Sequence, residues 1–391
     1  MKLLYLSNMF NHHQKPLADE LYRLLGDGNY YFVETEEMQL EQRKLGYQQY
    51  EVPYVLKYSE KTSSGIIRML CDFDVVICGE APLSLIKKRY RTGKLTFRDD
   101  ESRYKGLIKY LKWPVYTYAS LFYNKGYLLS ASAFGPADYF LSGMNPNRIF
   151  KWGYFPEVID YGNADVLLRS KQDRRIDTGL TIRIIWVGRL IQLKHPESMI
   201  FLAKYLKGKG LSFLINIIGI GKEEDTLRNL IAKYHLEHEV QLLGAVPSSK
   251  VRDYMMQSDI AVVTSDRQEG WGAVVNESMN CACAVVACEN IGSVPYLIQE
   301  KYNGLTFNDC DWNKMIEHVE WLIDHPSEMQ NLARNAYLTM LNIWNAKVAA
   351  KNFLALVESI QKNEKSNSIK EGPCSNADIL FRKTKFGFRF L

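Results

Sequence analysis

Short apolar runs alternate with amphipathic stretches along most of the chain. In the first part, strands are expected at residues 2–7, 30–34 and 73–78, and helices at 16–25 and 82–91. The alternation then restarts, with strands expected at 181–187, 213–218, 240–243, 260–264 and 285–287. Helices are expected at 196–206, 222–234, 249–257 and 273–281, and 311–361 is expected to be largely helical. Strands alternating with helices favour α/β domains with doubly wound parallel sheets.

The pattern predicts two Rossmann-like domains and a tail. The chain has 391 residues, 47% of them hydrophobic, which is enough for two cores. Residues 163–178 are polar and mixed in charge, so we expect a linker there. The domains are therefore expected at 1–165 and 180–361, with a tail at 362–391. Two such domains imply a cleft between them, the usual place for a ligand.

The segment 269–277, EGWGAVVNE, has a glutamate at each end and two glycines between them. It joins the expected strand 260–264 to the expected helix 273–281. In open parallel sheets, the junction of a strand end with a helix start binds nucleotides and phosphates. Gly270 and Gly272 allow a ligand to approach the backbone closely. Glu269 and Glu277 can then contact different parts of one long ligand, such as a sugar and a ribose.

Two cations follow the first strand of the expected second domain. Gly188 and Arg189 come directly after this strand, and Lys194 lies just before the expected helix 196–206. Arginine offers a fork of donors and lysine a compact charge, which together suit a diphosphate. The alternative is that both are ordinary surface cations.

These motifs together resemble the family-4 retaining glycosyltransferases, which have the GT-B fold. The resemblance is firm over residues 182–308. It implies two Rossmann-like domains facing each other across a cleft, and a nucleotide-sugar donor, UDP- or GDP-linked, as substrate. It also implies retention of anomeric configuration and no metal or other cofactor. Arg189 and Lys194 are then expected to hold the diphosphate, Glu277 to accept from the ribose hydroxyls, and Glu269 to lie beside the sugar.

Further donor contacts are expected in the same domain. Gly221 closes a Gly-Ile-Gly turn after strand 213–218, which the resemblance places near the nucleotide; a plain turn is the alternative. Val246 follows strand 240–243 in a loop that resembles the one against the donor base. Trp271 stands where many family members have phenylalanine and is expected beside the sugar ring. With Gly188, Gly270 and Gly272, these residues make up the expected donor site.

Two adjacent histidines, His12 and His13, follow the first strand of the chain. Such histidines point into the expected cleft, where they can bind phosphate, orient the acceptor or act as a base. We expect both histidines to lie on the acceptor side, and His13 is also a candidate catalytic residue. The family more often has a glycine-rich loop here, and capping of the strand end is the alternative.

The sequence predicts no metal site. Asp309 and Asp311 match the D-x-D motif of a different glycosyltransferase fold, but they follow the wrong strand, and we interpret them as a helix cap. The seven cysteines are odd in number and scattered, which is typical of reduced thiols in a cytosolic protein. Cys281 and Cys283 lack a second pair of ligands at zinc spacing, so we expect a structural role for them.

The formal charge is +5, and residues 87–125 contain eleven lysines and arginines but three acids, interleaved with aromatic residues. Such a segment suits an anionic membrane surface, a solvated helix with a buried aromatic face or, less well, nucleic acid. Residues 380–391 carry four cations and four phenylalanines and form a second candidate anchor; a frayed or docked terminus is the alternative. No apolar run is long enough for a transmembrane helix or a signal peptide.

The sequence therefore predicts a retaining glycosyltransferase of the hexosyltransferase type. Its expected role is the assembly of a capsular or O-antigen polysaccharide on a lipid-linked or oligosaccharide acceptor. The expected location is the cytoplasm, peripherally at the inner face of the membrane, without nucleic acid as a partner. A nucleotide-sugar epimerase of the same fold and a non-catalytic nucleotide-sugar binding protein are the alternatives.

Overall fold

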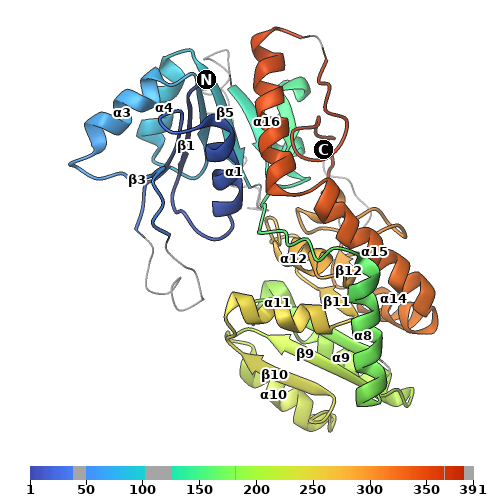
Figure 1. Ribbon diagram of the computed structural model, residues 1–391. Helices are drawn as coiled ribbons and strands as arrows, with labels where there is room; N and C mark the ends of the chain where they lie inside the picture. The colour runs from blue at the N-terminus through green and yellow to red at the C-terminus, as the bar shows by residue number, and fades with distance from the viewer. Residues whose placement is uncertain (38–49, 102–125, 181, 365, 383–391) are drawn as a thin grey trace. The chain divides into compact units, whose positions relative to one another are not determined.

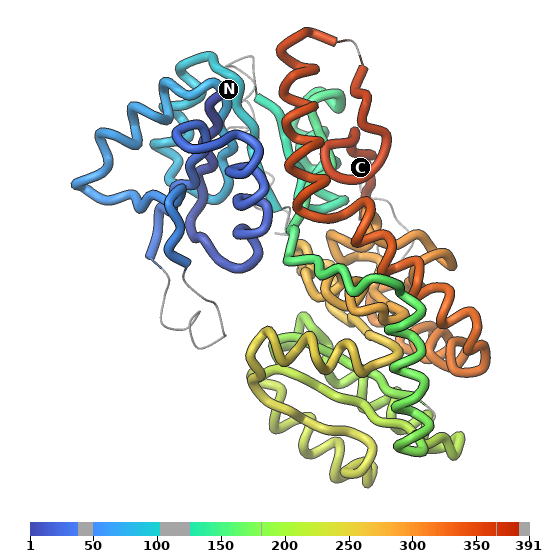
Figure 2. The backbone as a smooth tube through the Cα atoms, viewed as in Figure 1, coloured from blue at the N-terminus to red at the C-terminus, as the bar shows by residue number. Residues whose placement is uncertain are grey.

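The computed structural model describes residues 1–37, 50–101, 126–180, 182–364 and 366–382. These residues form two compact units, each built on its own parallel sheet (Figures 1 and 2). Among the described residues, unit 1 comprises Met1–Glu157 and Trp344–Arg382, and unit 2 comprises Val158–Ile343.

Unit 1 has a seven-stranded parallel sheet in the order β3-β2-β1-β4-β5-β6-β7. Its strands are β1 Leu3–Ser7, β2 Tyr30–Glu34, β3 Val55–Lys57, β4 Val75–Cys78, β5 Leu95–Asp100, β6 Gly126–Ser130 and β7 Ile149–Lys151. The central strands β1 and β4 are buried at every position. Continuous burial without alternation is typical of parallel strands covered on both faces.

The helices of unit 1 come from both ends of the chain. They are α1 Lys15–Leu25, α3 Ser63–Asp72, α4 Leu83–Arg91, α7 Gly135–Leu141, the 3₁₀ turn η1 Pro146–Arg148, and α16 Ala346–Gln361. Although it is far away in sequence, α16 packs against α1 (Figure 1). The stretch after α16 also joins unit 1, because the Lys151 amide donates to Ser375 O over 2.8 Å and Cys374 is fully buried.

Unit 2 has a six-stranded parallel sheet in the order β10-β9-β8-β11-β12-β13. Its strands are β8 Ile182–Val187, β9 Phe213–Ile218, β10 Val240–Gly244, β11 Ile260–Val263, β12 Ala284–Cys288 and β13 Leu305–Phe307. The helical elements of unit 2 are α8 Ala164–Thr178, η2 Gln192–Lys194, α9 Ser198–Gly208, α10 Glu224–Lys233, α11 Ser248–Gln257, α12 Val274–Asn280, α13 Val294–Leu297, α14 Trp312–Asp324 and α15 Pro326–Asn342. The order reverses between β8 and β11, and such a switch point is where open α/β sheets bind ligands at the carboxyl ends of their strands.

Two sequence-based boundaries differ from the structure. The predicted linker 163–178 is the helix α8, in which the Asn163 side chain accepts from the Asp165 amide at the start and Gly179 takes a left-handed conformation (φ 65°) at the end. Its buried Lys171 donates to Ser258 O and Ala282 O over 2.6 and 2.7 Å, which ties the helix to unit 2. The second boundary was placed at residue 361, whereas Trp344–Arg382 group with unit 1 because α16 packs on α1.

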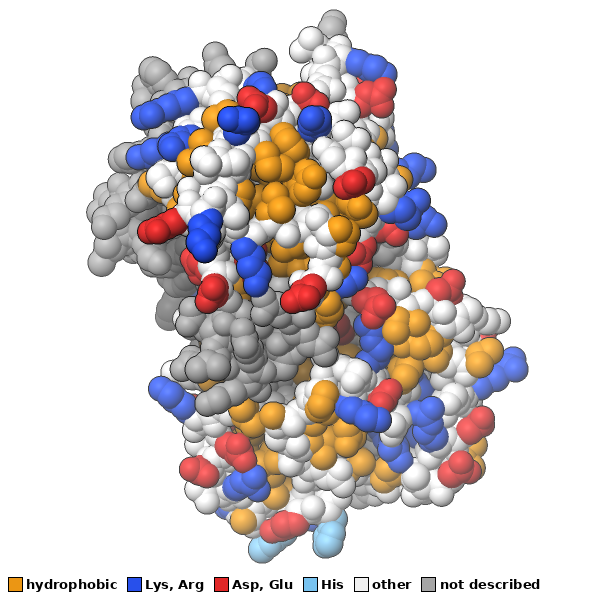
Figure 3. Space-filling view, turned by 60° about the vertical axis from the view of Figure 1, so that its left-hand side comes forward, with side chains coloured by type: hydrophobic (Ala, Val, Ile, Leu, Met, Phe, Trp, Pro, Cys, Tyr) orange, Lys and Arg blue, Asp and Glu red, His pale blue; other side chains and the backbone are white. Residues whose placement is uncertain are grey.

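The basic-aromatic segment 87–125 is only partly within the described residues, since 102–125 lie outside them. Lys87, Lys88 and Arg91 on α4 are exposed, as expected for a surface segment. Arg89 differs, because its side chain is fully buried and donates to four backbone carbonyls and the Thr96 hydroxyl. On the face shown in Figure 3, lysine and arginine side chains are interspersed with acidic ones.

Residues 383–391 of the tail lie outside the described residues. The second candidate anchor, at 380–391, therefore stays a prediction, since only its first three residues are described. Within the part of the chain that the structure describes, no helix combines the length and the apolar character needed to cross a bilayer.

Candidate active site

Most of the predicted donor residues lie on loops at the carboxyl edge of the unit 2 sheet. Gly188 and Arg189 follow β8, Gly221 follows β9, Val246 follows β10, and residues 266–273 follow β11. Because these strands are parallel and neighbours in the sheet, their carboxyl ends lie at one edge. His12 and His13 belong instead to unit 1, where they follow β1.

Two of the predicted site residues, one basic and one acidic, form an ion pair with each other. Lys194 Nζ forms an ion pair with Glu269 Oε2, and the two side chains are 14% and 16% exposed. Arg189 is exposed and forms no ion pair within the described residues. Arg189 and Lys194 belong to the same loop after β8, and two cations on one such loop suit an incoming anion, which can exchange places with the Glu269 carboxylate.

The turns after β8 and β9 pack backbone against backbone. The Leu190 amide donates to Ile220 O over 2.9 Å, and the Gly188 amide donates to Ile218 O over 3.0 Å. A Cβ atom on Gly219 would lie 1.8 Å from Gly188 O, and one on Gly221 would lie 2.2 Å from Leu190 O. The fold therefore requires these glycines, and a donor contact of Gly221 remains a prediction.

The loop between β11 and α12 is also closely packed. Gly270 and Gly272 are buried, and Gly272 has a left-handed conformation with φ 80°. A Cβ atom on Gly272 would lie 2.7 Å from Ile291 Cγ2 and 3.4 Å from Glu269 Cγ. A side chain at 272 would clash with Ile291 and would also be strained by the positive φ, so this tight loop requires glycine.

The indole of Trp271 is held inside unit 2. Trp271 is fully buried, and its Nε1 donates to Asn276 Oδ1 over 2.9 Å. The ring is therefore part of the core of unit 2. A contact between this ring and a sugar stays a prediction. The Trp271 carbonyl instead accepts from the Ser293 amide over 3.1 Å and fixes the loop.

Glu277 lies in the first turn of α12 and is partly buried. Burial raises the pKa of its carboxyl to about 7, and the Arg252 guanidinium opposes this shift. Near neutral pH the group is therefore divided between a carboxylic acid and a carboxylate. Only the carboxylate has its full capacity to accept hydrogen bonds from a diol.

Replacing Glu277 by glutamine is expected to remove a pH dependence of stability. The folded protein holds this proton more tightly than the unfolded chain, in which the pKa is 4.5. Stability is therefore lost as the pH rises from about 4.5 to about 7, and Glu277→Gln should be more stable than wild type at pH 8 by about 3 kcal/mol. Urea unfolding at pH 4.5 and pH 8 measures the difference.

The exposed Glu237 of unit 2 provides the control for this substitution. Glu237→Gln should follow the wild-type pH dependence. An equal stability difference between Glu277→Gln and wild type at both pH values would contradict the buried, raised-pKa description of Glu277.

The two histidines of unit 1 form a close aromatic group. The ring centroids of His12 and His13 are 3.9 Å apart, and His13 stacks on Tyr154 at 5.7 Å. Burial and the neighbouring His12 lower the pKa of His13 to about 3, so the imidazole is neutral at pH 7. A base with so low a pKa removes a proton poorly at neutral pH, which favours an orienting role over base catalysis for His13.

Two further sequence interpretations can be compared with the structure. The Asp311 side chain accepts from the Lys314 amide over 3.0 Å at the start of α14, which confirms the predicted helix cap. Asp309 forms an ion pair with Arg267 at 2.7 Å. Both acids thus have structural partners.

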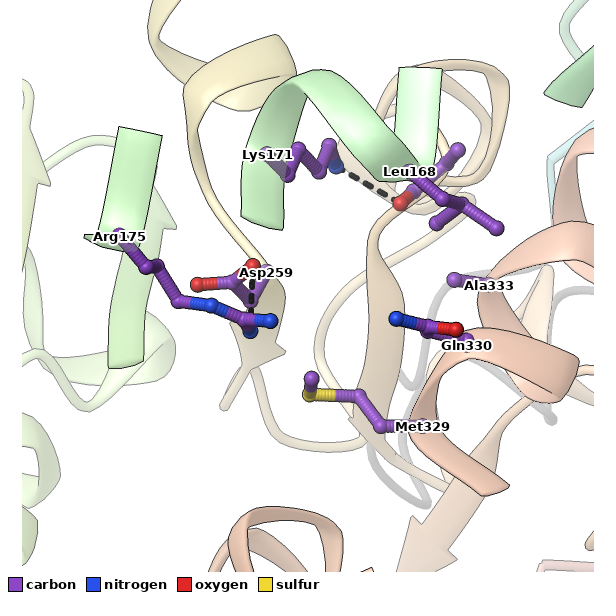
Figure 4. Close-up of a pocket in the computed structure, with 8 residues that line it drawn as sticks. Leu168, Lys171, Arg175, Asp259, Met329, Gln330 and Ala333 are labelled. Atoms are coloured by element: carbon purple, nitrogen blue, oxygen red, sulfur yellow. Dashed lines mark hydrogen bonds and ion pairs between the residues drawn. The ribbon is translucent and has the colours of Figure 1, made fainter. Parts of the chain in front are cut away.

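A small pocket in unit 2 lies away from these loops. It is lined by residues of α8 and α15 together with Asp259, and Figure 4 shows the ion pair between Arg175 and Asp259 inside it. The charged groups there already have partners, since Arg175 is 2.9 Å from Asp259 and Lys171 is held by two carbonyls. None of the predicted donor residues lines this pocket.

Residues 170–339 match the sequence model of the family described as glycosyl transferases group 1. The chain is therefore similar to this family over 170 of its 391 residues. The matched residues include the loops with Arg189, Lys194, Glu269 and Glu277.

Curated relatives are named for polysaccharide biosynthesis. The chain is 29% identical over 227 residues to WcaL of Escherichia coli, which is named as a colanic acid biosynthesis glycosyltransferase. It is 32% identical over 128 residues to the amylovoran biosynthesis glycosyltransferase AmsK of Erwinia amylovora. The alignments cover 56% of this chain and of WcaL, and 32% of this chain and 31% of AmsK, so the chain spans about half the length of WcaL and less of AmsK.

Solved structures match over both units. Anabaena HepE, crystallised with UDP, has a TM-score of 0.68 with 13% identity and covers 92% of this chain and 100% of its own. The lipopolysaccharide outer core galactosyltransferase WaaB has a TM-score of 0.64 with 15% identity and the same coverage. The predicted fold, two Rossmann-like parallel-sheet domains of the GT-B type, is confirmed.

Sequence reasoning missed His195, which lies beside Lys194. Its imidazole is placed between Glu197 and Asp266, at 3.1 and 3.3 Å. A histidine next to a predicted diphosphate ligand was visible in the sequence, but its two acidic partners lie in different loops and only the fold brings them together.

Proposed function

We propose that this protein is a retaining glycosyltransferase that moves a sugar from a nucleoside diphosphate donor to a hydroxyl acceptor. The observation that carries the proposal is the ion pair between Lys194 and Glu269 at the carboxyl edge of the unit 2 sheet, together with the exposed Arg189 on the same loop as Lys194. These are the charges that an anionic diphosphate and an electron-poor sugar need. The structural neighbour HepE has been crystallised with UDP and with UDP-glucose, which supports a donor of this class.

In this proposal the donor lies along the loops of unit 2. Arg189 and Lys194 bind the diphosphate, and the backbone around Gly188, Gly221, Gly270 and Gly272 allows it a close approach. Val246, half-buried in the loop between β10 and α11, contacts the base, and the Glu277 carboxylate accepts from the ribose hydroxyls. A UDP- or GDP-linked sugar fits this arrangement, and no metal is required because the two cations supply the positive charge.

Transfer breaks the bond between the anomeric carbon and the diphosphate oxygen, and its electron pair leaves with the diphosphate. The acceptor hydroxyl oxygen forms the new bond to the anomeric carbon on the same face, and its proton passes to the departing phosphate oxygen. Lys194 and Arg189 stabilise the charge that grows on that leaving group. Glu269, released from Lys194 when the diphosphate binds, lies beside the sugar and stabilises its positive charge.

The proposed acceptor is a lipid-linked saccharide in the assembly of a cell-surface polysaccharide. The relatives named for colanic acid and amylovoran biosynthesis support this class of product. The exposed Lys87, Lys88 and Arg91 of α4, together with Leu83, which is 42% exposed, support contact with an anionic membrane surface. Unit 1 would supply the acceptor side, with His12 and His13 orienting the hydroxyl.

A donor screen tests the proposed function. UDP-, GDP- and ADP-sugars are added separately, and the unfolding temperature of the protein is measured. The cognate donor at about 100 times its Kd should stabilise the protein by about 2.7 kcal/mol and raise this temperature by several degrees. The stabilising donor is then incubated with an acceptor extract, and NMR of the product reports the anomeric configuration.

The matched variant for the screen is Arg189→Ala, which should lose most of the stabilisation. If no nucleotide sugar stabilised the protein, or if the product had inverted configuration, the proposal of a retaining transferase would be wrong. A donor converted to an isomeric sugar without any acceptor would indicate the epimerase alternative instead.

A further inference from the structure

His195 adopts a left-handed backbone conformation, which is uncommon for residues other than glycine. It ends η2 with φ 49° and ψ 50°, which is the left-handed region. Its side chain is mostly buried, and both ring nitrogens face carboxylates: Nδ1 lies 3.1 Å from Glu197 Oε1, and Nε2 lies 3.3 Å from Asp266 Oδ2. The conformational cost at this position is therefore offset by two polar contacts of the ring.

The Asp266 side of this contact belongs to the loop that carries Glu269. The Asp266 amide donates to Leu193 O over 2.9 Å, and the Glu269 amide donates to Asp266 O over 3.0 Å. The Thr264 hydroxyl donates to Lys194 O over 2.5 Å. The loop after β8 and the loop after β11 are thus joined by backbone contacts next to Lys194. The contact of His195 with Asp266 adds a charged side-chain bridge between the same two loops, beside the ion pair of Lys194 with Glu269.

We propose that His195 is a positioning residue, whose imidazolium bridges Asp266 and Glu197 and so holds Lys194 and Glu269 in the arrangement that binds the nucleoside diphosphate. The proposal rests on the proposed function, because it concerns the same donor site. His195 acts through its neighbours and needs no contact with the donor.

The surroundings keep this ring protonated at neutral pH. Hydrogen bonds to Asp266 and Glu197 raise the pKa of His195 to about 9, against the effect of burial. The other groups that face the ring are Cys310, whose Sγ lies 4.0 Å from Nε2, and the Trp312 ring at 5.4 Å. Because the pKa of His195 in the folded protein is raised to about 9, the imidazolium bridge is intact at pH 7 and is lost as the pH rises through about 9.

Binding of UDP to the protein tests the proposal, with GDP and ADP measured in parallel. Asparagine is the replacement of choice, since it tolerates the left-handed conformation and bears no charge at any pH. His195→Asn should weaken binding of the nucleotide by about tenfold at pH 7, the effect of one charge-assisted hydrogen bond, and by less than about twofold at pH 10.

The chain contains a matched control for this substitution. His235 in unit 2 also has a left-handed conformation, with φ 54°, and is exposed. His235→Asn makes the same chemical change at the same kind of backbone position and should leave nucleotide affinity unchanged at both pH values. A general effect of replacing a left-handed histidine would appear in both variants.

A double-mutant cycle shows whether the effect passes through Asp266. If His195 and Asp266 act as a pair, His195→Asn combined with Asp266→Asn should weaken binding no more than the stronger single variant. Fully additive losses would overturn the bridging role. A wild-type affinity that falls with pH in the same way as that of His195→Asn would also overturn it.

The outcomes separate this proposal from the proposed function. If the wild-type protein binds none of the three nucleotides, the proposed function fails and this inference fails with it. If wild type binds one of them and His195→Asn binds it equally well at pH 7, the donor site stands and the positioning role of His195 is refuted.

Discussion

Replacing Lys194 by alanine is expected to lower kcat/KM for sugar transfer by about 10²- to 10³-fold, which corresponds to about 3–4 kcal/mol of transition-state stabilisation. In the structure, Lys194 is paired with Glu269 and 14% exposed, so its charge acts where little water screens it. Alanine removes the compact charge that stabilises the leaving diphosphate, and it also leaves the Glu269 carboxylate without its counter-ion. Initial rates of transfer at several donor concentrations measure the effect.

The control for this experiment is Lys204→Ala. Lys204 is an exposed lysine on α9 of the same unit, and its Nζ lies over the Tyr234 ring, 4.5 Å from the ring centroid. Lys204→Ala should keep the wild-type rate, and the unfolding temperature of both variants should be recorded. A Lys194→Ala protein that is folded and transfers sugar at a near-normal rate would remove Lys194 from the proposed mechanism.

Replacing Arg89 by methionine is expected to lower the free energy of unfolding of unit 1 by about 3–5 kcal/mol. The Arg89 guanidinium is fully buried and donates to the carbonyls of Leu70, Phe73, Asp74 and Leu95 over 2.7–3.1 Å. Methionine fills much of the same volume but has no donors, so these carbonyl oxygens lose their shared partner. Urea unfolding monitored by circular dichroism measures the loss.

Arg91→Met is the matched control, since Arg91 lies on the same helix α4 but is exposed. This substitution should change stability by less than about 0.5 kcal/mol. If the two variants had equal stability, the donor network of Arg89 would not be a major contributor to the folding of unit 1.

Much of the fold follows from patterns that are local in sequence. Strands β1, β2, β9 and β11 were predicted within one residue of their observed ends, because parallel strands covered on both faces are continuous apolar runs. The helix at 273–281 is likewise observed as α12 Val274–Asn280. The alternation of such elements was enough to predict two doubly wound sheets.

Other elements could not be predicted in this way. The helix α8 contains many charged residues and buries a lysine, so its apolar positions show no helical period, although Asn163 and Gly179 mark its two ends. The strand β5 ends in Arg98, Asp99 and Asp100. Because these charged residues belong to a basic segment, the sequence pattern did not indicate a partly buried strand there. The burial of Arg89 could not be predicted for the same reason, because a run of cations is typical of an exposed helix face.

The candidate site was predictable in its residue types but not in its contacts. The spacing of Glu269 and Glu277 and the cations after β8 pointed to one edge of one sheet. The ion pair of Lys194 with Glu269, the bridge from His195 to Asp266 and the burial of Trp271 depend on side chains that are far apart in sequence. Sequence spacing does not contain these distances.

The return of α16 to unit 1 affects how the chain reaches its folded state during synthesis. Unit 2 is made from one continuous stretch, Val158–Ile343, while unit 1 needs Trp344–Arg382 from beyond it. On the ribosome, the early part of unit 1 therefore emerges without the helix that packs against α1, and every residue of unit 2 is translated before that helix appears. Amino-terminal domains usually fold first during synthesis, whereas unit 1 cannot be completed until after unit 2 has been synthesised. Until then the surface of α1 that α16 covers stays exposed in the nascent chain, and transiently exposed apolar surface favours aggregation.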